Sequence, residues 1–514
     1  MIADYIVVGT GSAGAVIANR LSKSPGVQVT VLEAGPPDKD KFIHVPAGFP
    51  RLFRTDADWN YATEPQKELD GREIYWPRGK TLGGSSSMNA MMWVRGFAAD
   101  YDEWGQLAGE SWDFAHVEKY FRRIERGRMV ISEQRSPRSS TGAWLRAVTE
   151  CGYHVEAPNL DAPEGFCETR VTQRRGARWS TADAYLKPAR RRPNLRLLTN
   201  ATATRVVIED GRAVGVEFEQ DGRRRVVTAR REVVLCGGAI NTPQLLMLSG
   251  IGDRERLADQ GIEAVRHVPD VGQHLMDHLC VPLGFDAEQD TLFAAEKPLE
   301  LVNYLARRRG MLTSNVGEAY GFVRSRPELA LPDLELIFAP APFFDEGVGD
   351  PYHRHAVVMG PILLKPKSRG SITLRSADPH DKPVIDPRYL SDEDGADRAA
   401  LMEGLRITAR IAQTPTMQSV LGAIARPAGV SELTEATLET ALETISHTLY
   451  HPVGTCRMGS DDDSVVDPQL RVRGIDSLRV ADASVMPTII RGHTHAPSVL
   501  IGEKAADLIR STSR

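Results

Sequence analysis

The stretch "VVGTGSAG", residues 7–14, decides the fold class of this sequence. It joins a predicted strand over residues 4–8 to a predicted helix over residues 13–22, and a second strand is predicted over residues 27–32. A strand, a helix and a strand in this order form a β-α-β unit, the repeating element of α/β folds with a parallel sheet. We therefore expect a Rossmann-like domain that begins with the first residues of the chain.

The glycines of this stretch have the G-x-G-x-x-G spacing of a dinucleotide-binding turn. Gly9 would form the tight turn, Gly11 would let the backbone approach a pyrophosphate, and Gly14 would let helix and strand pack closely. Glu33 ends the next strand, 19 residues after Gly14, where a carboxylate accepts hydrogen bonds from an adenosine ribose. The pattern does not separate NAD from FAD, but Glu33 argues against the 2′-phosphate of NADP.

The composition is that of a globular protein without a nucleic-acid or membrane signature. The chain has 514 residues, 41% of them hydrophobic, which is enough for two or three domains with cores of their own. Its 63 basic and 68 acidic side chains give a net charge of −5, so no nucleic-acid partner is expected. No run is long and apolar enough to span a membrane, and no signal peptide precedes the first predicted strand. The five scattered cysteines contain no C-x-x-C pair, which disfavours disulfides and zinc and favours a cytoplasmic protein.

A segment rich in glycine and serine, "PRGKTLGGSSSMNAMMW", occupies residues 77–93. It has no G-x-S-x-G elbow, so its serines are not predicted to be hydrolase nucleophiles. Small residues next to an apolar run suit a backbone that packs against a planar ring. Here the sequence resembles the glucose–methanol–choline (GMC) oxidoreductase family, flavoenzymes that oxidise alcohols. Residues 79–93 match its first signature, and residues 238–252, "GAINTPQLLMLSGIG", match its second.

The resemblance extends over residues 4–509 and implies FAD as the cofactor. Some choline-oxidising relatives carry a histidine, bonded covalently to the flavin, at the position of Met88, so FAD is expected to be non-covalent here. The resemblance places Asn89 and Ala90 against the flavin ring and Asp482 at its ribityl or phosphate side. The residues expected to bind FAD, from the glycine turn and the family motifs together, are Gly9, Gly11, Ser12, Ala13, Gly14, Glu33, Ala34, Arg78, Leu82, Gly83, Ser86, Asn89, Ala90, Met91, Ala203, Cys236, Gly237, Asp482, Ala483, His495, Ala496 and Pro497.

The stretch "YHPVGTCRMG", residues 450–459, presents His451 on a proline–glycine turn. Oxidation of an alcohol by a flavin moves a hydride while the hydroxyl loses its proton, and an imidazole with its ordinary pKa near 6.5 suits the required base. In the family the histidine that matches His451 is the usual base. His495, in "RGHTHAPSV", matches the second member of the catalytic pair and would hydrogen-bond the substrate oxygen. His493 would point the other way in an extended segment and is expected to be structural.

The substrate is expected to be a small alcohol, and the electron acceptor O2 or a quinone or other carrier. Tyr450, Phe343 and Phe344 could form an apolar pocket, which favours an aromatic or aliphatic primary alcohol over a sugar. Pro497 and Ser498 begin the last predicted helix, whose positive end would face the flavin. The sequence does not predict an oligomeric state.

Two histidines and an aspartate lie close together in "VGQHLMDH", residues 271–278. The family usually reads V-G-x-N-L-x-D-H at this place, with a structural role, and His274 replaces the asparagine. No further ligands accompany His274, Asp277 and His278, so no metal site is expected.

Other reaction classes stay open at this point. Some relatives cleave hydroxynitriles with a flavin that remains oxidised, so a lyase is the alternative to an alcohol oxidase or dehydrogenase. A flavin-binding carrier protein without turnover is a third hypothesis. Residues 121–132 pass from helix to strand almost directly where the family usually inserts a longer loop, so either the lid is shortened or residues are missing from the sequence.

The expected fold is a mixed α/β architecture with two domains, a Rossmann-like FAD-binding domain and a substrate domain built from a sheet with helices. The FAD-binding domain is expected to be discontinuous. It would comprise residues 1–155, 191–284 and 441–514, the last with the catalytic histidines, whereas residues 156–190 and 285–440 would form the substrate domain.

Overall fold

The first sheet contains the beginning of the chain. The computed structural model describes residues 1–344 and 352–512. In spatial order the strands of this sheet are β8 (Leu195–Leu198), β2 (Val29–Leu32), β1 (Ile2–Val8), β11 (Arg223–Leu235), β10 (Arg212–Gln220) and β9 (Ala201–Glu209), with β23 (Leu478–Val480) also paired to β11. Strands β8, β2, β1 and β11 run parallel, whereas β11, β10 and β9 form an antiparallel meander. Strands β1 and β2 are almost wholly buried apolar runs, as central parallel strands are.

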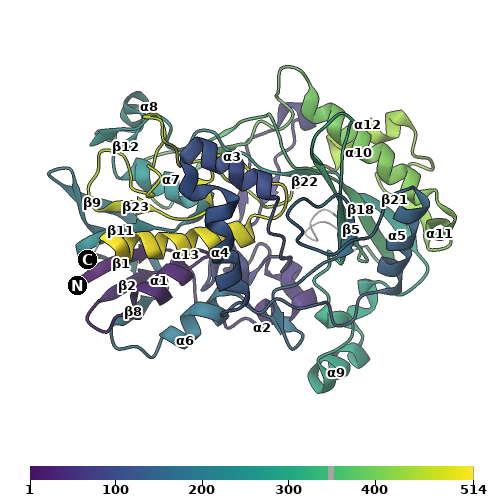
Figure 1. Cartoon of the computed structure of the whole chain (residues 1–514), viewed down its shortest axis with the longest axis horizontal. Helices are drawn as coiled ribbons and strands as arrows, with labels where there is room; N and C mark the ends of the chain where they lie inside the picture. Colours follow the sequence, from purple (N-terminus) through teal and green to yellow (C-terminus); the bar gives the residue numbers. More distant parts are fainter. Residues whose placement is uncertain (345–351, 513–514) are drawn as a thin grey trace.

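The second sheet is antiparallel and lies in the other half of the molecule (Figure 1). Its strands are β21 (Leu421–Arg426), β15 (Leu283–Ala287), β18 (Ala356–Leu363), β17 (Leu334–Ala339), β16 (Ala319–Val323) and β5 (Phe166–Glu168), with β14 (Leu279–Cys280) beside β18 and β22 (His447–Thr448) beside β14. Helix α10 (Ala396–Ala412) packs on β17 and β18 through its apolar face. The two sheets confirm the expected mixed α/β fold.

The helices pack around these sheets. Helix α1 (Gly14–Leu21) lies against α13 (His495–Thr512), which in turn contacts α4 (Phe114–Glu125). The other helices are α2 (Lys41–His44), α3 (Ala98–Ala108), α5 (Ser139–Glu150), α6 (Lys187–Ala189), α7 (Gly238–Leu248), α8 (Arg254–Asp259), α9 (Pro298–Arg307), α11 (Pro415–Gln418) and α12 (Glu435–Thr444). Short two-stranded sheets complete the fold: β3 (Tyr61–Ala62) with β4 (Tyr75–Trp76), β6 (Gln173–Arg174) with β7 (Ala177–Arg178), β12 (Ile251–Gly252) with β13 (Arg266–His267), and β19 (Ser371–Thr373) with β20 (Val384–Asp386). None of the described helices is both long and apolar enough to cross a membrane.

Three elements lie with the second sheet although their sequence segments were expected to belong to the FAD-binding domain. Helix α5 packs against α10 and α11, and strands β14 and β22 pair within the second sheet. These are short segments at which the chain crosses from one sheet to the other, and composition gives no signal for such crossings. Between α4 and α5 the chain pairs with Val171 through Ser132, in agreement with the direct passage from helix to extended chain read from the sequence.

The irregular segment over residues 36–84 links the two halves. Phe49 and Phe53 in and after the 3-10 helix η1 (Pro46–Leu52) belong to an apolar cluster with Val358 of the second sheet. At the other end, Gly84 lies so close to the glycine turn that a Cβ there would be 2.8 Å from the Cα of Gly11. The segment therefore contacts both halves of the molecule.

Candidate active site

A cavity of about 480 Å³ extends from the glycine turn after β1 to the histidines near the C-terminus. Its walls come from both sheets, through β1 and β11 on one side and β17 and β18 on the other. A volume of this size is typical of sites for cofactors and small ligands, which lie preferentially between domains. The cavity therefore has two ends: a nucleotide end at the glycine turn and a histidine end at the histidines near the C-terminus.

The glycine turn has the geometry that a bound pyrophosphate requires. Gly9 has a φ of +97°, and a Cβ on it would lie 2.4 Å from the carbonyl oxygen of Cys236. A Cβ on Gly14 would lie 2.1 Å from the carbonyl oxygen of Gly9, so this position packs helix against strand. Gly11 lines the cavity, and a Cβ there would meet no atom within 4 Å, which leaves the space that a phosphate would occupy.

Glu33 closes the nucleotide end behind this turn. Its carboxylate accepts hydrogen bonds from the Thr10 backbone N–H (3.0 Å), the Thr10 hydroxyl and the Gly35 backbone N–H (2.9 Å). Burial raises the pKa of Glu33, and these donors oppose that rise. Because Glu33 also lines the cavity, its carboxylate stands where a ribose hydroxyl of a dinucleotide would bind.

Asp482 differs from its expected role. Its Oδ1 accepts the Ser484 backbone N–H (2.8 Å) and hydroxyl (2.6 Å), and its Oδ2 accepts the Gly238 backbone N–H (2.8 Å) and the Thr242 hydroxyl (2.6 Å). These four donors use the lone pairs of the carboxylate, so none remains for the ribityl or phosphate side of a flavin. Asp482 instead ties the start of α7 to the turn after β23.

Two arginines, the buried Arg178 and the partly buried Arg78, fix the segment that was expected to lie against the flavin. Arg178 donates to the side-chain oxygen of Asn89 (2.7 Å) and to the Ser86 carbonyl (3.1 Å), and burial lowers its pKa to about 9. Arg78 donates to the Tyr450 carbonyl (2.6 Å) and so connects the same segment to the histidine turn. Sequence reasoning missed Arg178, because a single arginine in an irregular stretch carries no motif.

Most of the predicted cofactor residues line the cavity. These are Gly9, Gly11, Ser12, Ala13, Glu33, Ala34, Arg78, Ser86, Asn89, Ala90, Met91, Ala203, Cys236, Gly237, Asp482, Ala483 and His495. Five do not line it: Gly14, Leu82, Gly83, Ala496 and Pro497. Of the predicted substrate residues, Tyr450 and Phe343 line the cavity, whereas Phe344 packs against Tyr352.

His451 is held by its backbone and by its ring. The turn that presents it requires Gly454, whose φ is +91° and whose Cβ would lie 2.4 Å from the carbonyl oxygen of His274. The backbone N–H of His451 donates to Asp277 (2.7 Å), a buried carboxylate whose pKa burial raises to about 6. Burial lowers the pKa of His451 well below its ordinary value, with a further contribution from the neighbouring His493. The ring is therefore neutral near pH 7, and its pKa differs from the unperturbed value that the sequence suggested.

The ring that accompanies His451 is that of His493, not that of His495. The centroids of His451 and His493 are 4.8 Å apart, and His493 Nε2 lies 3.0 Å from the fully buried carboxylate of Glu335. Both histidines line the cavity. The prediction that His493 points the other way was wrong, because residues two apart face the same side of an extended strand. The segment is also not extended, since the chain bends at Gly492 and helix α13 begins at His495.

His495 lies at the nucleotide end of the cavity. Its Nδ1 is 2.9 Å from the hydroxyl of Ser12 in the glycine turn, and its ring meets the edge of Trp93 at a centroid distance of 5.7 Å. Burial lowers the pKa of His495 to about 4, with a contribution from Arg178. Because α13 begins at His495, the N-terminus of that helix faces the cavity two residues earlier than predicted.

A fourth histidine, His278, determines which nitrogen of His451 carries the proton. His278 Nε2 lies 3.1 Å from the carbonyl oxygen of Leu364, which can only accept, so Nε2 carries a hydrogen. Burial lowers the pKa of His278 to about 3, so this ring is neutral and its Nδ1 is an acceptor. His451 Nδ1 lies 3.0 Å from that atom and must donate to it. The neutral His451 ring therefore keeps its free lone pair on Nε2.

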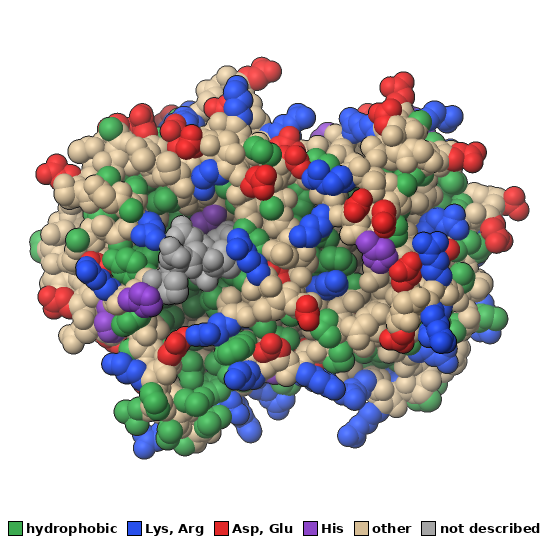
Figure 2. All heavy atoms as spheres, turned by 180° about the vertical axis from the view of Figure 1, so that it is seen from behind, with side chains coloured by type: hydrophobic (Ala, Val, Ile, Leu, Met, Phe, Trp, Pro, Cys, Tyr) green, Lys and Arg blue, Asp and Glu red, His purple; other side chains and the backbone are tan. Residues whose placement is uncertain are grey.

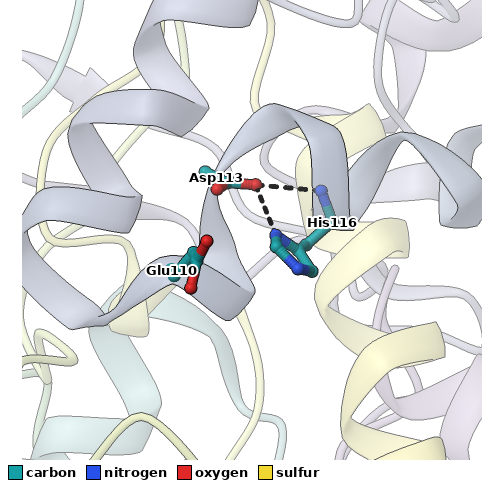
Figure 3. Close-up of side chains that lie close together, drawn as sticks. All are labelled: Glu110, Asp113 and His116. Carbon is teal, nitrogen blue, oxygen red and sulfur yellow. Dashed lines mark hydrogen bonds and ion pairs between the residues drawn. The ribbon is translucent and has the colours of Figure 1, made fainter.

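Neither of the two groups of possible metal ligands is assigned as a metal site. Asp277 and His278 are committed to His451, and His274 pairs with Asp270 (3.1 Å) instead of joining them. Among the described residues a second group lies on the surface, formed by Glu110, Asp113 and His116 (Figure 3). Asp113 caps helix α4 by accepting the backbone N–H of His116 (2.9 Å), and the imidazole of His116 contacts the same oxygen (2.8 Å). Helix capping accounts for this arrangement.

Comparison with known proteins identifies the family. Residues 3–280 match the N-terminal model and residues 366–502 the C-terminal model of the GMC oxidoreductases, and the chain belongs to this family. An uncharacterized GMC-type oxidoreductase of Mycobacterium tuberculosis is 70% identical over 524 residues, covering 99% of each chain. Alcohol dehydrogenase [acceptor] of Pseudomonas putida is 41% identical over 533 residues, covering 98% of this chain and 95% of that relative.

A solved structure extends the comparison to the cofactor. A formate oxidase of Aspergillus oryzae, studied for the modification of its FAD, superposes with a TM-score of 0.91 at 28% identity and covers 99% of this chain and 98% of its own. Together with the family and the geometry of the nucleotide end, this likeness supports FAD as the cofactor. The protein is an oxidoreductase of the class that acts on CH–OH groups.

Proposed function

We propose that the protein oxidises an apolar primary alcohol to its carbonyl compound, with His451 as the base. The observation that carries this proposal is the chain of hydrogen bonds that leaves the free lone pair of a buried, neutral imidazole on Nε2 of His451. When bound, FAD supplies the hydride acceptor, and the role of the protein is to remove the hydroxyl proton at the moment of transfer. A neutral ring with one defined acceptor nitrogen meets that requirement without a change of tautomer.

We propose His493 as the second member of the pair. Its Nε2 lies 3.0 Å from the Glu335 carboxylate, which fixes the orientation of the ring beside His451. A ring of this kind beside His451 would stabilise the developing alkoxide oxygen of the substrate. His495, at the glycine turn, would instead orient the cofactor through Ser12.

The lining of the cavity supports an apolar substrate. Around Tyr450 the walls are aromatic and aliphatic, with side chains from three parts of the fold: Phe49, Phe53, Met88, Val316, Ile337, Ala339, Phe343 and Leu449. Among the described residues that line the cavity the carboxylates are Glu33, Asp381 and Asp482, and Glu33 and Asp482 are committed at the nucleotide end and beside α7. An aromatic or aliphatic alcohol suits such walls better than a sugar, which needs several hydrogen-bonding partners.

We propose that FAD is bound without a covalent link. Met88 is buried in the apolar cluster that lines this part of the cavity, and a thioether side chain is not the imidazole that forms the flavin bond in some relatives. Because no covalent link is proposed, denaturation should release free FAD, and a flavin that stays with the precipitated chain would contradict this assignment.

The electron acceptor would be O2 or a quinone-like carrier.

The decisive experiment records the visible spectrum of the purified protein under anaerobic conditions while benzylic, aliphatic, amino and sugar alcohols are added in turn. Bleaching by benzylic or aliphatic alcohols is the expected result, and reoxidation on admission of air would separate an oxidase from a dehydrogenase. An oxidised flavin that no alcohol bleaches, in a protein that cleaves hydroxynitriles, would replace the proposal by the lyase function. A protein that binds flavin without either activity would be a carrier.

Replacement of the three histidines assigns their roles. His451→Ala should slow flavin reduction by about 10³-fold and His493→Ala by about 10²-fold, the range typical of a lost base and a lost oxyanion donor, with FAD retained. His495→Ala should weaken FAD binding more than it slows reduction of the fully loaded protein. If His495→Ala slowed reduction as much as His451→Ala and His493→Ala did not, the assignment of the pair would be reversed.

A further inference from the structure

Helix α9 (Pro298–Arg307) stands at the edge of the molecule and packs against η6 (Leu292–Glu296) and η7 (Met311–Thr313) (Figure 1). Most of its large apolar side chains face outward: the exposed fractions are 76% for Leu299, 50% for Leu301, 60% for Val302 and 62% for Leu305. Figure 2 shows the resulting apolar projection, with basic side chains around it. An apolar surface of this kind on a projecting element indicates an interaction site.

The remaining side of the helix faces the body of the protein. Tyr304 is buried, and Glu300 turns inward to accept the Met311 backbone N–H (2.8 Å). Glu300 is the one charged residue in the sequence over residues 298–306. The outward face consequently carries no charge along the helix, although most solvent-exposed helix faces are polar.

Positive charges stand at both ends of this apolar face. Lys297 precedes the helix and Arg307, Arg308 and Arg309 follow it, and all four are exposed. Arg308 lies over the ring of Tyr304, 4.8 Å from its centroid, which holds this cation beside the helix. An apolar helix face bounded by basic residues is the pattern of a helix that lies in the interface of an anionic membrane.

We infer that α9 binds the surface of a membrane that contains anionic lipids. The apolar side chains would enter the boundary between headgroups and acyl chains, while the basic residues contact lipid phosphates. A second copy of the chain fits less well, because a helix of this length covers roughly 15 Å by 10 Å, against about 800 Å² per partner in a stable dimer. The positive charges at both ends would also face each other in a symmetric pair.

Membrane binding through α9 would also bring the substrate end of the cavity close to the lipid. This step of the inference rests on the proposed function. Leu292 of η6 and Met311 of η7 belong to the same apolar cluster as Phe49, Phe53 and Phe343, which line the cavity. Apolar contacts therefore continue from the base of α9 to the substrate end of the cavity. An apolar alcohol or a quinone-like carrier dissolved in the membrane would be concentrated beside it.

Cosedimentation of the FAD-loaded full-length protein with lipid vesicles tests the inference independently of any substrate. We expect binding to vesicles of phosphatidylcholine with phosphatidylglycerol, weaker binding to phosphatidylcholine alone, and loss of the difference at high salt. Replacement of Leu299, Val302 and Leu305 by Gln should reduce the affinity by about 100-fold or more, from the apolar area that no longer enters the lipid. Replacement of Arg307 and Arg309 by Gln should reduce it by about 25-fold, about fivefold for each charge.

Matched replacements elsewhere on the surface provide the controls. Val226 and Val265 are exposed apolar residues remote from α9 in sequence, and Arg190 and Arg191 are an exposed basic pair. Their replacement by Gln should leave vesicle binding unchanged, and the flavin spectrum of every variant should show that the fold is intact. The inference is overturned if the parent protein does not bind anionic vesicles, or if the control variants lose as much binding. Self-association that only the α9 variants lose, without vesicle binding, would assign the face to a second copy.

Discussion

Replacement of His278 tests the origin of the lone pair on His451 most directly. In the structure His278 Nδ1 accepts the proton of His451 Nδ1 at 3.0 Å, while its own Nε2–H is held by the Leu364 carbonyl. His278→Leu removes the acceptor and leaves a buried N–H of His451 without a partner. The ring can then escape the penalty by moving its proton to Nε2, the atom that should accept the substrate proton.

The magnitude follows from the cost of an unpaired buried donor, which is about 1–3 kcal/mol. If the productive tautomer becomes less stable by that amount, the limiting rate of flavin reduction should fall by about 5- to 150-fold, since about 1.4 kcal/mol corresponds to a factor of ten. An upper bound of about 10⁴ applies if the wrong tautomer takes over completely, as it does when the orienting carboxylate of a serine protease is replaced by an amide.

The assay is anaerobic stopped-flow reduction of the FAD-loaded variant over a range of alcohol concentrations. His278→Asn is the matched control, because it has nearly the shape of Leu and offers an amide oxygen to His451. We expect Asn to restore the rate to within about tenfold of the parent, which a purely structural role of His278 would not produce. Reduction of His278→Leu at the parental rate, or equal losses in Leu and Asn variants that keep FAD, would refute the reasoning.

Three further outcomes depend on other parts of the structure. Gly11→Ala should weaken FAD binding by about tenfold or more, because the methyl group would occupy the space beside the turn, whereas the exposed Gly26→Ala should not; fluorescence titration of FAD measures both. Glu335→Gln keeps an acceptor for its histidine partner but removes the charge, so flavin reduction in stopped flow should slow by about tenfold with FAD still bound. Burial lowers the pKa of Lys504 to about 7 from 10.5, so the unfolded chain binds more protons between these values and stability rises with pH across that window. Lys504→Met should remove this rise in thermal unfolding experiments, unlike the exposed Lys39→Met, and an unchanged pH dependence would contradict the assignment.

The fold could be predicted from the sequence where local patterns and long-range packing agree. The β-α-β unit over residues 2–32 combines a buried apolar run, a glycine turn and a largely buried helix, and each signal predicts the same unit. Helix α10 was predictable for the same reason, since Leu401, Leu405, Ala409 and Ala412 all lie on its buried face. The packing of α5 with the second half of the molecule and the membership of β14 and β22 in the second sheet were not predictable, because segments that cross between the two halves give no signal of their partner.

The nucleotide end could likewise be located from the sequence, since glycine spacing reflects backbone contacts that only glycine allows. The function of Asp482 could not, because its four donors come from segments distant in the sequence. Glu335 and His278 were missed as partners of the histidines for the same reason. A buried hydrogen-bond network is determined by tertiary packing, and no single segment contains its pattern.

The misplacement of His493 has two causes, the assumption of an extended segment and the assignment of opposite sides to residues two apart. Alternation assigns residues two apart to the same side of an extended strand, and a turn or a helix cancels any such rule. In the structure Gly492 has a φ of +131° and α13 starts at His495, so the two histidines belong to different local conformations. Their rings accordingly reach different ends of one cavity, His493 beside His451 and His495 beside Ser12. Under the proposed function, His493 would therefore act on the substrate and His495 on the cofactor.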